Sequence, residues 1–138
     1  MTTTTTIAII GKTPLAQTLS KGRYRILLFG WECKEGELMD CPIEASWEAD
    51  IIVLAAQAEE MAEKIRAVAV QKIVLSNGSL ETLQTLLPHS KVVEFSNLSP
   101  EQRVINISGD DGEALYATAD LLRSVGFFPD IQLKRNKL

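Results

Sequence analysis

Short apolar runs alternate along the chain with segments whose apolar residues recur at helical spacing. Continuous apolar runs are typical of strands covered on both faces, and they predict strands over residues 7–10, 25–29, 51–54, 72–75, 91–95, 104–107 and 128–133. Helical spacing and capping residues predict helices over residues 14–20, 59–70, 80–87 and 111–125. Residues 31–49 follow neither pattern. The threonines before Ile7 either lengthen the first strand or form a frayed terminus.

This alternation predicts an α/β, Rossmann-like fold with helices on both faces of a mostly parallel central sheet. We expect about six to eight strands, with Ile7–Ile10 in the middle of the sheet because that run is wholly apolar. The segment between residues 95 and 104 is too short for a helix, so we expect a hairpin or a short irregular connection and a mixed sheet edge. No linker or repeat divides the chain, which predicts a single domain over residues 1–138.

Composition narrows the classes of function. The chain has 138 residues, is 46% hydrophobic and carries a net charge of −4. No basic face is visible, so we expect neither nucleic acid nor a membrane as a partner. Cys33 and Cys41 fit no zinc spacing and His89 is the only histidine, so we expect no metal and free thiols. The first residues do not form a signal peptide, and we expect a cytoplasmic location.

The first strand-to-helix turn is the candidate phosphate-binding loop. In open α/β sheets, ligands bind beyond the carboxyl ends of the strands, and dinucleotide-binding turns read G-x-G-x-x-G/A. Gly11 and Ala16 match the first and third positions, whereas Thr13 replaces the second glycine. The Thr13 hydroxyl and the Leu15 and Ala16 amides would be the donors to a pyrophosphate, with Lys12 adding charge. The alternative is a purely structural turn, in which Thr13 caps a helix beginning at Pro14.

The end of the second predicted strand is the candidate nucleotide-selecting segment. Glu32 lies 21 positions after Gly11, near the spacing at which an acidic residue binds the ribose hydroxyl of NAD. Lys34 would instead favour NADP, and both residues can equally be solvated loop charges. Trp31 would cover an adenine ring or belong to the core.

Polar residues elsewhere have plainer interpretations. Asp111 is expected to cap the long helix, with Asp110 supporting the turn, rather than both forming an acid–base pair. Asp120 and Arg123 are expected to pair on its surface. Asn77 follows the fourth predicted strand and would line the ligand site or belong to a plain turn.

Four stretches resemble the coenzyme F-420-dependent NADP oxidoreductase family. They are residues 7–11, 48–56, 91–97 and 107–127, of which the last, beginning Ile-Ser-Gly-Asp-Asp-Gly-Glu-Ala, is the most specific. The resemblance implies NADP(H) binding at the glycine loop and hydride exchange with a deazaflavin. It assigns Ala55 and Ala56 to the loop beside the nicotinamide and matches Asn97 to an asparagine of the family. The departures from the family pattern are Thr13 for glycine, Gln57 for proline, Trp31–Glu32 for a serine–arginine pair and Ser96 for an aromatic residue.

These observations predict an oxidoreductase-like domain that binds NADP or NAD and exchanges hydride with a deazaflavin or flavin-type partner. The alternative is a non-catalytic Rossmann-like module for nucleotide sensing or protein interaction that has lost its phosphate site. We also expect a homodimer, because so short a chain forms a shallow cleft. The expected cofactor-binding residues are Gly11, Lys12, Thr13, Pro14, Leu15, Ala16, Trp31, Glu32, Ala55, Ala56, Gln57, Asn77 and Asn97.

Overall fold

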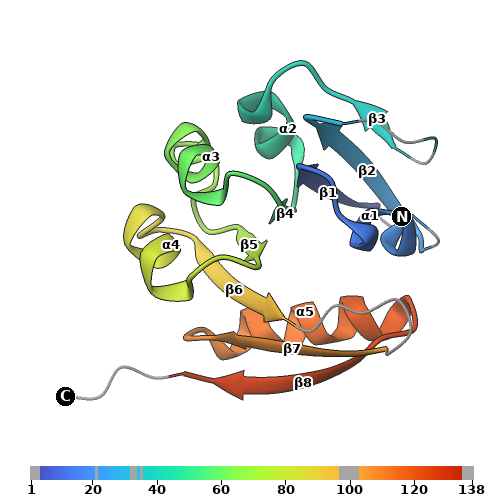
Figure 1. Cartoon of the computed structure of the whole chain (residues 1–138), viewed down its shortest axis with the longest axis vertical. Helices are drawn as coiled ribbons and strands as arrows, with labels where there is room; N and C mark the ends of the chain where they lie inside the picture. Colours follow the sequence, from blue (N-terminus) through green and yellow to red (C-terminus); the bar gives the residue numbers. More distant parts are fainter. Residues whose placement is uncertain (1–3, 21, 32–33, 35, 97–102, 135–138) are drawn as a thin grey trace.

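The computed structural model describes residues 4–20, 22–31, 34, 36–96 and 103–134 of the chain. It contains a single eight-stranded sheet with the strand order β3-β2-β1-β4-β5-β6-β7-β8 (Figure 1). In chain order the elements are β1 (Thr5–Ile10), α1 (Pro14–Leu19), β2 (Tyr24–Phe29), β3 (Glu37–Leu38), α2 (Pro42–Glu48), β4 (Ile51–Leu54), α3 (Ala58–Ile65), β5 (Ile73–Ser76), α4 (Leu80–Leu86), β6 (Lys91–Ser96), β7 (Val104–Gly109), α5 (Gly112–Ser124) and β8 (Phe128–Leu133). The predicted α/β, Rossmann-like fold is confirmed.

The strand pairing is parallel except between β6 and β7. The mixed sheet predicted from the short segment before β7 is therefore confirmed. Strand β1 lies between β2 and β4, with Ile7 paired to Ile26 on one side and to Ile51 on the other. Residues Ile7–Ile10 are at most 2% exposed, as predicted for a strand in the interior of the sheet.

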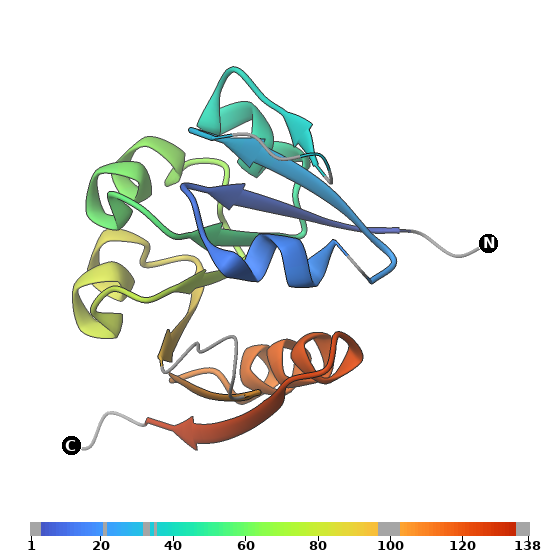
Figure 2. The ribbon, with the colours of Figure 1, turned by 45° about the vertical axis from the view of Figure 1, so that its right-hand side comes forward.

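Two hydrophobic cores cover the two faces of the sheet. Helices α1 and α5 pack on one face, and α2, α3 and α4 pack on the other (Figure 2). Strand β1 contributes Ile7 and Ile9 to the first core and Ala8 and Ile10 to the second, because successive side chains point to opposite faces. Both cores are built on the strand that leads into the candidate phosphate-binding loop.

The sequence pattern missed two elements between residues 31 and 49. Strand β3 has only two residues, both exposed, so it carries no apolar signal. Helix α2 buries Ala45 and Ser46 while Ile43 and Trp47 are 43% and 69% exposed. Its large apolar residues thus face away from the core, which is why helical spacing did not reveal it. Cys41, just before α2, is a free thiol, whereas Cys33 lies outside the described residues.

Helices α5 and α3 can be compared with the contacts and the bounds predicted for them. The Asp111 side chain accepts a hydrogen bond from the Ala114 amide (3.0 Å), so its predicted capping role is confirmed. The Asp120–Arg123 surface pair is also confirmed, at 3.3 Å. The helix predicted over residues 59–70 was too long, since α3 ends at Ile65. A turn follows it, in which Gln71 adopts a positive φ of 63°.

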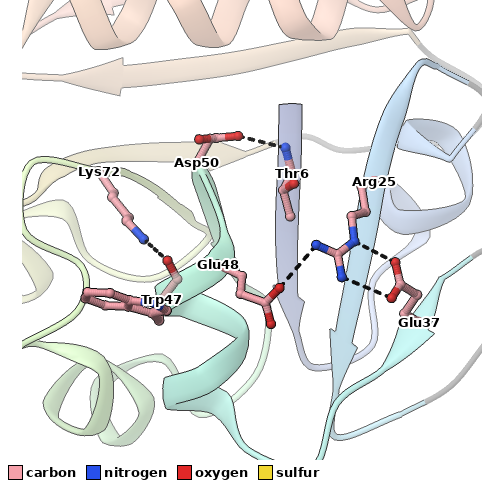
Figure 3. Close-up of polar contacts among 7 residues, drawn as sticks. All are labelled: Thr6, Arg25, Glu37, Trp47, Glu48, Asp50 and Lys72. Carbon is pink, nitrogen blue, oxygen red and sulfur yellow. Dashed lines mark hydrogen bonds and ion pairs between the residues drawn. The ribbon is translucent and has the colours of Figure 1, made fainter. Parts of the chain in front are cut away.

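Side-chain contacts tie the amino ends of the central strands to α2 and β3 (Figure 3). Arg25 of β2 forms ion pairs with Glu37 of β3 (2.7 Å) and Glu48 of α2 (3.2 Å). These hydrogen bonds raise the pKa of Arg25 and lower that of Glu37. Asp50, before β4, accepts a hydrogen bond from the Thr6 amide of β1 at 2.8 Å. This end of the sheet is therefore held by charged side chains.

Helix α2 is also tied to the start of β5. The Lys72 ammonium group donates to the Ser46 carbonyl at 2.6 Å. It also donates to the Trp47 carbonyl at 2.7 Å (Figure 3). Burial lowers the pKa of Lys72, although the charge of Asp50 opposes this shift.

None of the helices that the structure describes has the length and the apolar character of a membrane span.

Candidate functional site

The carboxyl ends of β1, β2 and β4 meet at the point where the strand order reverses. From β1 the chain passes through α1 to β2 on one side, while β4 lies on the other side. The Gly11 amide donates to the Phe29 carbonyl of β2 (2.9 Å), and the Ala55 amide donates to the Ile10 carbonyl of β1 (2.8 Å). Backbone bonds thus join the loops after the three strands. This is the position at which open α/β sheets bind their ligands.

Gly11 is required at this position for two structural reasons. Its φ of 96° is a conformation that other residues rarely adopt. A Cβ on Gly11 would also lie 2.5 Å from the Cβ of Ala56 and 2.7 Å from its amide nitrogen. The loop after β4 therefore packs directly on the backbone of the loop after β1. The fold thus brings together Gly11, Ala55 and Ala56, three of the expected cofactor-binding residues.

Thr13 is committed to helix α1. The residue is only 7% exposed, and its Oγ1 accepts a hydrogen bond from the Leu15 amide at 3.2 Å. Pro14 has no N–H to donate. In this conformation the N-cap side chain already accepts from the Leu15 amide, one of the donors that the sequence suggested for a phosphate. The Ala16 amide is the next along α1, and the Lys12 side chain is exposed beside the loop.

Trp31, at the end of β2, belongs to the core. Its side chain packs against the cluster formed with α1 and α5, which favours the core interpretation over an adenine contact. The indole Nε1 is buried and has no hydrogen-bond partner among the residues that the structure describes. Lys34 is exposed, whereas Glu32, the candidate ribose ligand, lies outside the described residues.

Glycine also follows β2, and sequence reasoning did not include it in the site. Gly30 has a φ of 89°, and a Cβ there would come within 3.9 Å of the Gly11 amide nitrogen. A glycine directly after each of two neighbouring strands was the available signal. Together the two glycines keep side chains away from the carboxyl ends of β1 and β2.

The loop after β4 ends in a residue with a strained backbone, because it has a positive φ and is not glycine. Gln57 has a φ of 50° and stands at the N-cap position of α3, but its side chain forms no capping hydrogen bond. Ala56 and Gln57 are both exposed, beside the buried Gly11. Their exposed position next to Gly11 would allow contact with a ligand at this edge.

The end of β5 extends this edge of the sheet. Ser76 is fully buried, and its Oγ donates to the Leu54 carbonyl (3.1 Å) and accepts from the Gly78 amide (3.0 Å). Ser76 thereby fixes the turn in which Asn77 is exposed. Asn97, the predicted residue after β6, lies outside the described residues.

The remaining candidate groups lie apart from these loops. His89 is exposed in the segment between α4 and β6. Among the described residues, no group of three or more histidine, cysteine, aspartate or glutamate side chains could hold a metal ion. The exposed residues of these loops include Lys12, Ala56 and Gln57.

No known protein-family profile matches the sequence, and no curated protein is similar to it in sequence. The fold, by contrast, closely matches solved reductase structures. A diketoreductase superimposes with a TM-score of 0.79 at 14% identity, covering 99% of this chain and 66% of its own. Plasmodium falciparum pyrroline carboxylate reductase, solved with NADP bound, gives 0.76 at 14% identity, covering 93% of this chain and 57% of its own.

A third structure belongs to the group that the sequence resembled. A putative F420-dependent NADP reductase from Arthrobacter sp. FB24 gives a TM-score of 0.75 at 16% identity, covering 94% of this chain and 84% of its own. The chain thus has the Rossmann-type fold of NAD(P)-binding reductases, among which the F420-dependent reductase is one of several similar structures. It spans less than two thirds of the length of the first two proteins compared above.

Proposed function

We propose that this chain binds a nicotinamide dinucleotide at the carboxyl ends of β1, β2 and β4, as the cofactor-binding domain of an oxidoreductase. The position of Gly11 carries the proposal. It is a buried, positive-φ glycine at the point of strand reversal, with the loop after β4 in direct contact. A pyrophosphate would lie near the Ala16 amide, and Lys12 would balance part of its charge. The nicotinamide end would extend past Ala55 and Ala56 toward Asn77.

The choice of cofactor and of hydride partner extends this proposal. Lys34 is an exposed cation on the loop after β2 and would favour the 2′-phosphate of NADP. Glu32 would favour NAD. The resemblance to the F420-dependent reductases supports a deazaflavin or flavin as the hydride partner. In such a reaction the cofactors supply the hydride chemistry, and the chain supplies binding and orientation.

One observation supports the second candidate function, a non-catalytic module. Pro14 and the Thr13–Leu15 hydrogen bond together remove two amide donors from the first turn of α1. A chain that had lost its phosphate site would tolerate this arrangement. The two functions therefore differ in whether Thr13 blocks the site or adapts to a bound phosphate.

Calorimetric titration of the full chain with NADPH, NADH and a deazaflavin distinguishes the two functions. Thr13→Gly removes the capping oxygen and frees the Leu15 amide, so it should tighten dinucleotide binding by at least ~1 kcal/mol, about fivefold. Thr13→Ser keeps the hydroxyl cap and loses only the methyl group, so it serves as the matched control for steric obstruction. If neither the native chain nor Thr13→Gly binds at millimolar cofactor, the non-catalytic module is the better account.

The homodimer remains part of the proposed function, because ligand sites in shallow clefts are often completed at interfaces. Light scattering at several protein concentrations measures this directly. A monomer mass at every concentration would contradict it.

A further inference from the structure

A separate cavity of about 660 Å³ lies beside α4, over β6 and the ends of β7 and β8. This volume falls within the range of about 300–1,000 Å³ that is typical of small-molecule sites. None of the residues that line it belongs to the loops after β1, β2 and β4. The cavity is therefore distinct from the loops at which dinucleotide binding is proposed.

The cavity arises because the helix layer on one face of the sheet stops at α4 (Figure 1). Helix α5 packs on the opposite face, against Phe95, Ile107 and Ile131. The register pairs Glu94 with Ser108, and Ser108 with Gln132, so these three side chains point to the α4 side. In the described part of the chain, β7 and β8 have no helix above them there. The cavity lies where the helix layer ends, between α4 and the uncovered face of these strands.

The wall formed by α4 is fixed by its own hydrogen bonds. The Gln84 side chain donates to the carbonyls of Leu87 (2.8 Å) and Ser90 (2.9 Å) and accepts from the Val92 amide (3.3 Å). The Gln84 side-chain amide thus joins α4 to the start of β6. Leu80 adds an apolar surface to the same wall. The cavity consequently has a preformed shape with one apolar side.

The charged groups of the lining are predominantly acidic. They are Glu81 on α4, Glu94 on β6, Asp110 after β7 and Lys134 after β8. Lys134 Nζ lies 3.9 Å from Glu94 Oε1, at the outer limit of an ion pair. Glu81 and Asp110 have no ion-pair partner among the residues that the structure describes. Within the described ranges, a bound cation would therefore meet two carboxylates, Glu81 and Asp110, that form no ion pair.

We propose that this cavity binds a small organic cation, an alkyl amine or alkyl guanidinium. The ammonium or guanidinium group would interact with Glu94 and Asp110, and the methylene groups would lie against Leu80. The three carboxylates lie on different elements, which suits a ligand longer than a single ion. Charge-assisted hydrogen bonds to carboxylates supply the strongest of these contacts.

The test is an amide-resolved NMR titration of the full chain with 1,4-diaminobutane, beside its neutral analogue 1,4-butanediol. The diamine should shift the amides of Leu80, Glu81 and Glu94 without shifting those around Gly11, whereas the diol should not. Glu94→Gln and Asp110→Asn should each weaken binding by about tenfold, as expected for loss of one charge-assisted hydrogen bond. Glu60→Gln, an exposed carboxylate on α3, changes the net charge equally and should leave binding unchanged.

Lys134→Met separates a cation site from an anion site. Removing this ammonium group should leave diamine binding intact or strengthen it, because Lys134 competes for Glu94. The proposal is overturned if the diamine shifts no lining amide at 10 millimolar (an order-of-magnitude ceiling for weak specific binding). It is also overturned if Glu60→Gln weakens binding as much as Glu94→Gln, or if acetate binds the cavity in a Lys134-dependent way.

Discussion

The two ends of the central strands are stabilised in opposite ways. At the amino end, charged side chains join neighbouring elements: Arg25 contacts Glu37 and Glu48, and Asp50 contacts the Thr6 amide (Figure 3). At the carboxyl end, the contacts are made by backbone, with Gly11 against Ala56 and its amide bonded to Phe29. One end of the sheet is occupied by the protein's own charged groups, whereas at the other end two glycines keep side chains away from the ends of β1 and β2.

This difference separates fold stability from ligand binding. At the amino end, Arg25 is paired with Glu37 and Glu48, and Asp50 is bonded to the Thr6 amide. The carboxyl end instead presents exposed backbone next to glycine, where a ligand can approach closely. Substitutions at the amino end should therefore change stability alone, while those at the carboxyl end test both stability and binding.

The largest expected effect is that of Gly11→Ala. The new methyl group would lie 2.5 Å from the Ala56 Cβ, in a backbone conformation with a φ of 96°. Backbone strain and overpacking together should lower the free energy of unfolding by about 2–4 kcal/mol. Urea denaturation measures the change.

Gly112→Ala is the matched control for that substitution. Its Cβ would meet nothing within 4 Å, at the start of α5. Alanine favours helix, so this variant should be as stable as the native chain or up to ~1 kcal/mol more stable. Equal losses at both positions would contradict the structural explanation of Gly11. Loss of cofactor binding in a Gly11 variant is therefore informative only when the variant is shown to be folded.

The continuous apolar runs allowed the core of this fold to be predicted from the sequence. Ile7–Ile10 is buried on both faces, and the buried strand Ile51–Leu54 forms β4 with the predicted bounds. Helix α2 could not be predicted in this way because it exposes Trp47 rather than burying it. Local sequence spacing reveals an element only when its apolar residues share one face.

The candidate site was predictable only as far as its contacts are local. The Thr13 cap involves residues two positions apart, and the Thr-Pro pair was its signal. The cap also occupies the Leu15 amide, which leaves one donor fewer for a phosphate. That result follows only when the donors of the first turn are considered one by one. The contact of Gly11 with Ala56 joins two loops far apart in the chain, so no local pattern could reveal it. Glycine at position 11 therefore has a structural explanation in addition to the phosphate-binding one.

Asp50→Ala tests the amino end at its most central contact. The substitution would leave the Thr6 amide, on a residue only 8% exposed, without its hydrogen-bond partner. An unsatisfied buried amide should lower the free energy of unfolding by about 1–2 kcal/mol. Asp120→Ala, which removes an exposed surface pair, should change it by less than ~0.5 kcal/mol. Similar values for the two variants would show that Asp50 contributes no more than a surface charge.

Lys72→Met tests how α2 is attached. The two carbonyls at the end of α2 would lose their donor, and the expected loss of stability is about 1 kcal/mol. The Lys72 ammonium also lies 6.0 Å from the centre of the Trp47 ring, so tryptophan fluorescence should change with the substitution. Lys64→Met, on the exposed side of α3, is the control and should alter neither quantity. Unchanged fluorescence in Lys72→Met would mean that the Trp47 contact does not persist in solution.

The smallest expected effect is that of Glu37→Gln, and its pH dependence identifies the cause. Arg25 lowers the pKa of Glu37 below its ordinary value of 4.5, so the folded state holds the proton less tightly than the unfolded state. The stabilisation is therefore present above that ordinary value and is lost as the pH falls through the lowered pKa. The native chain should have a slightly higher Tm than Glu37→Gln at neutral pH, and the difference should shrink below pH 4.5.

The side chains of Glu37 and Arg25 are both exposed, so added salt should also reduce the difference in Tm at neutral pH. A difference that is constant with pH and salt would assign the effect to packing of β3 rather than to the ion pair. The amino end of the sheet would then be stabilised by packing rather than by charge, as the carboxyl end is.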